Sequence, residues 1–346
     1  MMSGTSLDGM DLCSVIFSEN EKGYTYTIEY AKTYTYDTTW ENDLKKAYSQ
    51  STEEVDQLNK KFTLYVNQKI KEFIDEFSVK SIDLIASHGH TIWHKPNEGF
   101  TLQIGNLPNL KEGLPVPVVC DFRVQDVQFG GQGAPLVPIG DQLLFSNYDF
   151  CLNLGGFSNI SFQENGIRRA FDICPINILL NEYTLLYYQI PYDDQGKFAS
   201  QGKICLELLD ELNSLEFYNK NTPKSLGVEE VNAFYKPIVS KYVIEPQDLL
   251  CTLVEHMAIQ IGKVVNQYQG KTMLVTGGGA FNSYLIERIQ KYCKTIELII
   301  PDTLTIEYKE ALIFAFLGYL KIQDKINCLS SVTGAKKDHS SGVIYR

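Results

Sequence analysis

Three short glycine-containing segments, each joined to an apolar strand pattern, constrain the fold of this chain of 346 residues more than any other feature. They are MMSGTSLDGMD at residues 1–11, CLNLGGFSNISF at 151–162 and TMLVTGGGAFNSYLIERIQKY at 272–292. A backbone without side chains lets N–H groups approach phosphate oxygens closely, so each segment is a candidate phosphate or nucleotide loop. Taken singly, each also fits a plainer role as a turn, a hairpin or a close helix–strand contact.

The first segment combines glycine with hydroxyl and carboxylate side chains. Two glycines bracket two hydroxyls and a carboxylate, namely Gly4, Thr5, Ser6, Asp8 and Gly9. Asp8 and Asp11 are candidates for holding Mg²⁺ directly or through water, because this cation keeps several waters and binds few carboxylates. The segment is not a Walker A loop, since no Gly-Lys-Ser/Thr follows it.

The other two segments have the patterns expected of a sheet with helices. In residues 151–162, apolar residues on both sides of Gly155-Gly156 predict a strand, a tight turn and a second strand. In residues 272–292, a short apolar strand from Met273 to Thr276 runs into Gly277-Gly278-Gly279. The helix that follows carries its apolar residues on one face.

Strand and helix patterns alternate along the rest of the chain, which predicts an α/β fold. Strands are expected at 12–18, 24–35, 81–86, 116–122 and 342–345, and helices at 53–77, 139–147, 249–269 and 310–320. The sequence contains no internal repeat and no low-complexity segment.

Composition limits the classes of partner. Hydrophobic residues make up 44% of the chain and charged residues 21%, which is typical of a globular protein with room for two cores. The net charge is −11, so a nucleic-acid partner is not expected. No leader pattern and no long apolar run is present, so we expect neither a signal peptide nor a membrane span. Eight scattered cysteines without a CxxC pair favour reduced thiols and a cytoplasmic location.

The order of the glycine segments resembles the sugar kinase, heat-shock ATPase and actin superfamily, in which two glycine hairpins hold phosphates and a later glycine loop holds adenosine. Eight strings along the chain resemble one family more closely, the anhydro-N-acetylmuramic acid kinases of bacterial cell-wall recycling. They are MSGTSLDGMD at 2–11, SHGHTIWHKP at 87–96, LQIGN at 102–106, DFRVQDVQFGGQGAPLVP at 121–138, LNLGGFSNISF at 152–162, TPKSLG at 222–227, TGGGAFN at 276–282 and SVTGA at 331–335.

This resemblance implies a two-lobed, actin-like (ribonuclease-H-like) α/β fold with a nucleotide and sugar cleft between the lobes. The implied domains are an N-terminal lobe at 1–140, a C-terminal lobe at 141–328 and a C-terminal tail at 329–346 near the hinge. The implied cofactors are ATP and Mg²⁺, with Asp8 as the magnesium ligand. A homodimer is also expected.

The resemblance assigns residue roles for nucleotide binding and catalysis. The ATP-binding residues it implies are Gly4, Thr5, Ser6, Leu7, Asp8, Gly9, Met10, Asp11, Gly155, Gly156, Ser158, Gly277, Gly278, Gly279 and Asn282. Asp172 matches the catalytic aspartate, which in the family activates a water that opens the 1,6-anhydro ring while O6 takes the γ-phosphoryl group. A helix N-cap or a turn carboxylate is the plainer alternative for Asp172.

Six further residues are candidates for binding the sugar: His88, His90, Asp121, Arg123, Gln132 and Glu310. The planar fork of Arg123 fits a carboxylate such as the lactyl group of the substrate, and a salt bridge between the lobes is the alternative role for Asp121 and Arg123. Gln132 lies between two glycines and can hydrogen-bond sugar hydroxyls or be a plain loop residue. Glu310 matches a family glutamate, although a carboxylate in the first turn of a helix is also favoured by the helix dipole.

His88, His90 and His94 form an H-x-H-x₃-H cluster that also fits a zinc site. No cysteine or further histidine accompanies the cluster, and the family has no zinc. We therefore expect these histidines to contact sugar or to pack.

Two departures from the family pattern stand out. The family has DxGPGN around the catalytic aspartate, whereas this chain has DICPIN, with Cys174 and Ile176 in place of glycines. If those glycines have positive φ, the exchange strains the loop and adds bulk near the ligand. At the front, Met1 and Met2 are all that remains of the apolar strand that leads into the first glycine segment in the family, so either the natural start lies upstream or this strand is shortened here.

Alternative functions therefore remain at this point. An active kinase would convert 1,6-anhydro-N-acetylmuramic acid, water and ATP to N-acetylmuramic acid 6-phosphate and ADP. A catalytically impaired member would bind sugar or nucleotide as a sensor. A kinase for another amino sugar is a third possibility.

Overall fold

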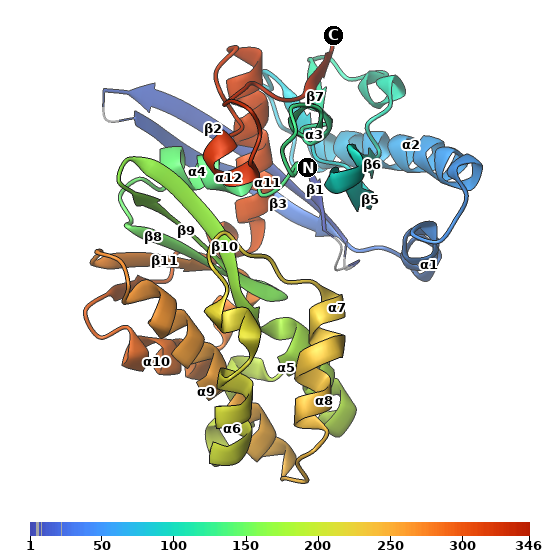
Figure 1. Ribbon diagram of the computed structural model, residues 1–346. Coiled ribbons are helices and arrows are strands. Elements are labelled where there is room, and N and C mark those ends of the chain that lie inside the picture. Colours follow the sequence, from blue (N-terminus) through green and yellow to red (C-terminus); the bar gives the residue numbers. More distant parts are fainter. Residues whose placement is uncertain (5–6, 8, 22) are drawn as a thin grey trace. The chain divides into compact units, whose positions relative to one another are not determined.

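The computed structural model describes residues 1–4, 7, 9–21 and 23–346, which form two compact units (Figure 1). The first unit contains Met1–Phe145 and Tyr308–Arg346, and the second contains Ser146–Glu307. These limits differ from the expected lobe limits mainly at 308–328. This segment belongs to α11 (Thr303–Ile322) and the loop after it, and the helix packs so closely on the first unit that a Cβ added at Gly318 would lie 2.7 Å from that of Ala86.

The first unit is built on two sheets. Five strands have the order β3-β2-β1-β5-β6, and three have the order β13-β7-β4. The strands are β1 (Met2–Ser3), β2 (Met10–Asn20), β3 (Gly23–Tyr34), β4 (Ile85–Ser87), β5 (His90–Lys95), β6 (Phe100–Ile104), β7 (Val118–Cys120) and β13 (Val343–Tyr345). Its helices, besides α11, are α1 (Thr38–Ala47), α2 (Thr52–Glu76), α3 (Val124–Gln128), α4 (Val137–Leu144) and α12 (Ser330–Thr333).

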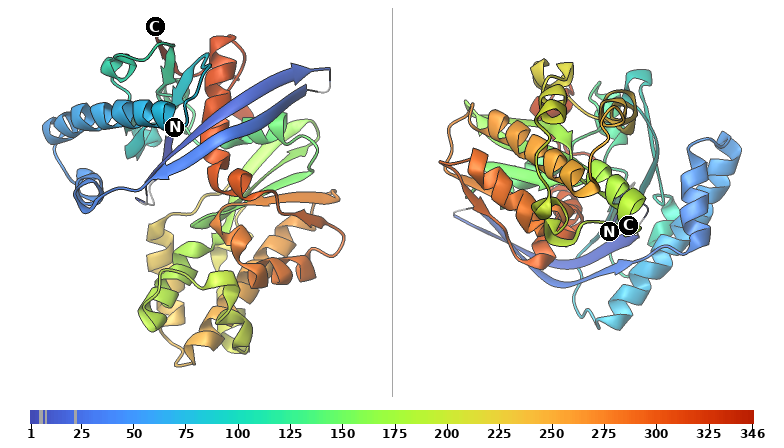
Figure 2. Two further views of the ribbon diagram at one scale, coloured as in Figure 1. Left: turned by 180° about the vertical axis from the view of Figure 1, so that it is seen from behind. Right: turned by 90° about the horizontal axis from the view of Figure 1, so that it is seen from below.

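Local sequence explains the main elements of this unit. Strands β2 and β3 pair over their whole length as a long antiparallel ribbon, drawn in blue in Figure 2. Helix α2 begins with a capping box, in which Ser51 and Glu54 each bond the backbone N–H of the other. Its apolar stripe, including Phe62 and Val66, is fully buried against the sheet residues of the unit.

The second unit has one sheet of order β10-β9-β8-β11-β12. Its strands are β8 (Phe150–Leu154), β9 (Phe157–Glu164), β10 (Ile167–Pro175), β11 (Thr272–Thr276) and β12 (Glu297–Ile299). Its helices are α5 (Asn177–Tyr188), α6 (Leu206–Asn213), α7 (Val228–Glu230), α8 (Lys236–Val239), α9 (Pro246–Val265) and α10 (Ser283–Tyr292). Helices α9 and α10 lie side by side (Figures 1 and 2), and a separate hydrophobic core fills the unit.

The two units share one strand arrangement. In each, three consecutive strands form an antiparallel meander, and the first strand of the meander has a parallel neighbour on its other side: β5 beside β1, and β11 beside β8. The strand patterns at 12–18, 24–35 and 151–162 are confirmed, as are the four long helix patterns. In the part of the chain that the structure describes, no helix is long and apolar enough to cross a membrane.

Candidate active site

Two glycine turns of the second unit lie at the same edge of its sheet. Strands β8 and β11 are parallel neighbours, with Thr276 opposite Asn153, so the Gly155-Gly156 turn and the Gly277–Gly279 loop follow the carboxyl ends of adjacent strands. Ligands of α/β sheets commonly bind at this edge. The sequence predicted both turns. That they lie next to each other follows from the pairing of β8 with β11.

The glycines of these turns divide into packed and bare positions. Gly277 has φ +82°, and a Cβ there would lie 2.5 Å from Asn153 Oδ1, while one at Gly279 would lie 2.7 Å from Leu154 Cβ. A Cβ at Gly156 would have no neighbour within 4 Å, and one at Gly278 would meet only Asn177 Nδ2 at 3.7 Å. The packed glycines hold the two turns together, and the bare ones leave backbone accessible to a ligand.

Helix α5 begins directly beside the first of these turns. The Ile176 N–H donates to Gly156 O at 2.8 Å, and Asn177 Nδ2 donates to Leu154 O at 3.1 Å. The N–H groups of Ile176, Asn177 and Ile178 all donate to carbonyls of the Gly155-Gly156 turn, so the positive end of the α5 dipole lies next to the turn and holds it in place.

Asp172 lies on β10, opposite Asn159 of β9, at a bulge between Asp172 and Cys174. Its Oδ2 accepts a hydrogen bond of 2.9 Å from the Leu226 N–H, and burial raises the pKa of this carboxyl to about 6. The residue caps no helix, because α5 has Ile176 at its N-cap position. The arrangement gives a partly buried, oriented carboxylate that is ionised at neutral pH and still basic enough to accept a proton.

The TPKSLG segment supports Asp172, a role that the sequence did not assign. The Asp172 N–H donates to Lys224 O at 2.9 Å, so this segment extends the edge of the sheet next to β10. Lys224 Nζ donates to Phe217 O at 3.1 Å and lies 4.5 Å from the centre of the Phe217 ring. Burial lowers the pKa of this lysine. Its presence in a string shared with the family was the only signal in the sequence.

The DICPIN substitution places no side chain at a positive φ, but Ile176 has φ −120° and ψ −98°, outside the α and β regions. Neither Cys174 nor Ile176 is among the residues with positive φ, and both side chains are fully buried in the core of the second unit. The expectation that they add bulk on the ligand side is therefore wrong. The physical reason is that the side chains of Cys174 and Ile176 point into the apolar core, where they fill space between other buried side chains.

Two predicted ATP-binding side chains have local structural partners. The Ser158 hydroxyl is fully buried, donates to Cys174 O at 3.0 Å and accepts from the Cys174 N–H at 3.1 Å, so it fixes the bulge beside Asp172. Asn282 is the N-cap of α10, where its Oδ1 accepts from the Leu285 N–H at 3.0 Å. Their assignment to ATP stays a prediction.

The first glycine segment lies between β1 and β2 of the first unit. A Cβ at Gly9 would lie 2.7 Å from Tyr34 O, Leu7 has φ +61°, and Met10 is fully buried. Asp11 Oδ1 accepts a hydrogen bond of 2.6 Å from the Thr33 hydroxyl. Gly4 accepts from the Leu7 N–H at 3.5 Å. The predictions for Thr5, Ser6 and Asp8 fall outside the described residues.

His88 and Arg123 form one hydrogen-bonded group in the first unit. Arg123 Nε donates to His88 Nε2 at 2.8 Å, and Arg123 Nη1 donates to Gly133 O at 2.8 Å. The histidine therefore accepts through a neutral ring, and both burial and the guanidinium charge lower its pKa. Burial also lowers the pKa of Arg123 to about 10, which leaves it charged at neutral pH.

The other two histidines have separate partners. His90 Nδ1 lies 2.9 Å from Ser3 Oγ, and His94 Nδ1 lies 3.1 Å from Thr101 Oγ1. Burial lowers the pKa of His90 to about 4, so its ring is neutral. Within residues 1–4, 7, 9–21 and 23–346, these histidines do not gather into a metal-ligating group. The structure thus favours the contact role over the zinc role.

The remaining substrate candidates differ in how accessible they are. The Gln132 side chain is exposed, while its N–H donates to Thr333 O at 2.8 Å. Asp121 has φ +56°, a costly conformation for a non-glycine residue, and burial raises the pKa of its carboxyl. Glu310 is an exposed residue of α11 whose charge favours the protonated form of Arg123. All six candidates belong to the first unit, whereas Asp172 belongs to the second.

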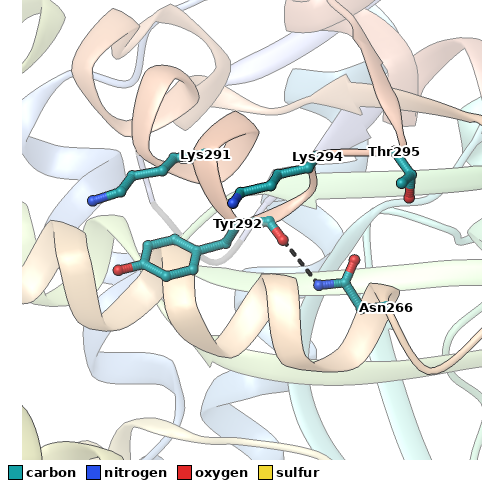
Figure 3. A pocket seen from close by; sticks show the side chains of 5 residues that line it. All are labelled: Asn266, Lys291, Tyr292, Lys294 and Thr295. Atoms are coloured by element: carbon teal, nitrogen blue, oxygen red, sulfur yellow. Dashed lines mark hydrogen bonds between the residues drawn. The ribbon is translucent and has the colours of Figure 1, made fainter.

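A shallow pocket of about 350 Å³ lies elsewhere on the second unit, at the carboxyl end of α10 (Figure 3). Its lining includes Lys291, Lys294 and Tyr292, whose carbonyl accepts from Asn266 Nδ2 at 2.9 Å. The glycine loop precedes the opposite, amino end of this helix. The pocket is therefore separate from the candidate active site.

The chain has two α/β units with one strand order. The second unit has glycine turns at the ends of parallel strands and a desolvated carboxylate beside them. These features are those of ATP-dependent phosphotransferases built from two such units. Comparison with known proteins narrows this class. The family model described as anhydro-N-acetylmuramic acid kinase matches residues 1–346. The chain belongs to this family.

Named relatives agree with the family model. Anhydro-N-acetylmuramic acid kinases from Actinobacillus pleuropneumoniae serotype 7 and Mannheimia succiniciproducens are 33% and 34% identical, each over the whole chain and 97% of the relative. That of Sulfurimonas denitrificans is 30% identical over the whole chain and 98% of the relative. Among solved structures, an activator of 2-hydroxyisocaproyl-CoA dehydratase from Clostridium difficile with bound ADPNP covers 55% of this chain and 68% of its own, at 14% identity and a TM-score of 0.35. This likeness is too slight to carry an argument.

Proposed function

We propose that this chain is an ATP-dependent kinase that converts 1,6-anhydro-N-acetylmuramic acid and water to N-acetylmuramic acid 6-phosphate in bacterial cell-wall recycling. The observation that carries the proposal is the Asp172 carboxylate. It is oriented by the Leu226 N–H, has a pKa raised to about 6, and belongs to the same unit as the two glycine turns. Family membership over the whole chain supplies the substrate.

Asp172 is the proposed general base. It takes a proton from water as the water oxygen bonds to the anomeric carbon. The bond from that carbon to O6 breaks, and O6 takes the γ-phosphoryl group of ATP, so the products are the 6-phosphate and ADP. A base with a pKa just below the working pH suits this step, because it is ionised and still accepts a proton readily.

The glycine turns are the proposed nucleotide site. Gly156 and Gly278 leave their backbone bare, and the start of α5 adds a positive dipole end for a phosphate group. In the first unit, Arg123, His88 and Gln132 are proposed to bind the sugar, with the guanidinium facing its carboxylate.

Magnesium, location and oligomeric state remain proposals. Mg²⁺ is proposed to accompany ATP, with Asp8 as a ligand that lies outside the described residues. Asp11, the neighbouring carboxylate, accepts a hydrogen bond from Thr33 at Oδ1, which fixes its orientation as a second candidate for contacting the ion or its water. All eight cysteines are free, which supports a reducing, cytoplasmic location. A homodimer is a prediction that sedimentation would test.

A coupled ADP-release assay tests the function. We expect turnover with the 1,6-anhydro sugar that depends on a divalent cation, and far less with the open-ring sugar, which needs no ring opening. Turnover on neither sugar, by a folded protein that binds nucleotide, would contradict the proposal and support the sensor alternative. Faster turnover on the open-ring sugar would indicate a plain amino-sugar kinase.

A further inference from the structure

A buried group of three metal-binding side chains lies in the first unit, and none of the three has been assigned a role in catalysis. Asp126 comes from α3, and Cys328 and His339 come from the C-terminal segment. The three side chains are 0%, 1% and 6% exposed, and one ligand atom of each lies within 4.8 Å of the others. Buried carboxylate, thiol and imidazole groups gathered in this way need either mutual hydrogen bonds or an ion.

The backbone holds two of the three side chains in place. Cys328 and His339 face each other across an isolated antiparallel bridge, with N–H···O bonds of 3.1 and 3.2 Å in both directions. Directly opposite residues of an antiparallel pair project their side chains to the same face. The thiol and the imidazole are therefore presented together, as ligands of a preformed site.

Asp126 is fixed from the other side. Its Oδ2 accepts from the Gly133 N–H at 2.7 Å, and its Oδ1 accepts from the Thr333 hydroxyl at 2.8 Å and from the Cys328 thiol at 3.1 Å. Such outer hydrogen bonds orient a ligating carboxylate in known metal sites.

The imidazole of His339 is the observation that points to a ligand. Its Nδ1 lies 3.1 Å from Lys337 O, a contact that requires this nitrogen to carry the proton. Nε2, the other ring nitrogen, is buried without a hydrogen-bond partner and lies 3.6 Å from Asp126 Oδ1. An ion bound between these two atoms would give Nε2 the partner that it lacks. A ring N–H bonded to a backbone carbonyl is also the usual second contact of a metal-ligating histidine.

We propose that Asp126 Oδ1, Cys328 Sγ and His339 Nε2 form a binding site for a structural zinc ion. A mixed oxygen, sulfur and nitrogen donor set suits Zn²⁺, whose tetrahedral ligands lie roughly 3.3–3.7 Å apart. Asp126 Oδ1 lies 3.1 Å from Cys328 Sγ and 3.6 Å from His339 Nε2. The fourth ligand is a water molecule or the second oxygen of Asp126. Binding displaces the thiol proton of Cys328 to solvent, so one proton leaves for each ion bound.

The surroundings allow the ion to enter and give it a consequence. His339 lines a surface pocket of about 420 Å³ together with Lys337, Asp338 and Phe129, which gives a path from solvent. Asp126 also holds Gly133, the neighbour of Gln132, through its second oxygen. Zinc would therefore tie the C-terminal segment to the loop that carries a candidate sugar-binding residue, and would stabilise the first unit.

Zinc titration of the full chain, first treated with a chelator, tests the proposal. We expect one Zn²⁺ per chain, a rise in melting temperature that the chelator reverses, and, with Co²⁺ in its place, a thiolate-to-cobalt charge-transfer band. Loss of an outer-shell partner alone costs about 10–100-fold in metal affinity, so Cys328→Ser should weaken zinc binding by at least about 100-fold. Cys293→Ser, at another fully buried cysteine, should bind zinc as the parent does.

Three outcomes would overturn the proposal. They are an unaltered parent chain that binds no zinc, cobalt spectra without the thiolate band, and zinc bound equally by Cys328→Ser. The first two need no variant, so a misfolded variant cannot obscure the result. None of these readouts depends on kinase turnover.

Discussion

The two units have the same strand arrangement, yet they present polar groups in opposite ways. In the second unit, Gly156 and Gly278 leave their backbone without covering side chains. The Asp172 carboxylate there has one N–H donor, from Leu226. In the first unit, His88 and Arg123 bond each other, and His90 bonds Ser3. The second unit thus has accessible backbone for a ligand, whereas the polar side chains of the first unit are hydrogen-bonded to one another.

This difference indicates a division of labour. Backbone N–H groups and a helix dipole recognise phosphate without side chains, so a nucleotide site can consist of glycine turns. A sugar with a carboxylate needs side chains held in a fixed geometry, and a hydrogen-bonded network supplies that geometry at little cost in entropy on binding. Variants that alter one unit at a time test this division.

The largest effect is expected for Asp172→Asn in the second unit. The amide keeps the size of the side chain and can still face the Leu226 N–H, but it accepts no proton from water. Loss of a general base typically lowers kcat by about 10²–10⁴-fold. Steady-state kinetics with the anhydro sugar would measure this loss. Binding of both substrates should be retained.

Two controls accompany this variant. Asp121→Asn, in the first unit, should raise KM for the sugar more than it lowers kcat. If instead Asp121→Asn lost kcat and Asp172→Asn changed mainly KM, the roles of the two residues would be exchanged. Because burial raises the pKa of folded Asp172 to about 6, its ionisation at pH 7 opposes folding. Asp172→Asn should therefore be at least as heat-stable as the parent at pH 7.

A smaller effect is expected for Arg123→Lys in the first unit. Lysine keeps the charge but cannot bond His88 and Gly133 together from one planar group. Hydrogen bonds to charged groups contribute about 1.5–3 kcal/mol, so kcat/KM for the sugar should fall roughly 10–100-fold, mainly through KM. Arg169→Lys, at an exposed pair with Glu164, should have normal kinetics. A kcat loss as large as that of Asp172→Asn would contradict the division of labour.

Gly278→Val should weaken nucleotide binding by about tenfold, equivalent to 1.4 kcal/mol. The position is exposed, has no positive φ and has nothing closer to its Cβ site than Asn177 Nδ2 at 3.7 Å, so the protein should fold normally. Calorimetric titration with ATP would measure the change, while KM for the sugar should stay constant. Unchanged ATP affinity in the folded variant would remove this loop from the nucleotide site.

The smallest effect on turnover is expected for Ile176→Gly, which restores a family glycine. The side chain is fully buried in the core, so its removal should destabilise the protein by about 2–5 kcal/mol or more. At a temperature where the variant is folded, kcat should equal that of the parent. Ile167→Gly, at an exposed residue of β10, should be much less destabilising. A clear gain in kcat would show that the isoleucine does impair the site.

Sequence predicted the second unit better than the first. Glycine turns after apolar strands are local signals, so the positions of Gly155-Gly156 and Gly277–Gly279 were predicted directly. The position of Asp172 was predicted only through the resemblance of DICPIN to the family pattern. The bulge that Ser158 fixes beside it was not, because that contact joins neighbouring strands through a side chain.

The networks of the first unit could not be predicted, because they depend on contacts between distant residues. Arg123 and His88 are 35 positions apart. Cys328 and Asp126 are 202 apart, and the sequence assigned them to different lobes. The positive φ considered for the DICPIN residues is not found, because sequence shows a lost glycine but not the φ angle or the direction of the new side chain.

The pH dependence of kcat/KM for the anhydro sugar tests the central claim most directly, since it reports the ionisation of the free enzyme. With Asp172 as the base, activity should be constant above neutral pH and fall about tenfold per unit below a pKa of about 6. This acid limb should vanish from the residual activity of Asp172→Asn. A limb near the ordinary aspartate value of 3.8, or one that persists unchanged in the variant, would contradict the assignment of Asp172 as the catalytic base.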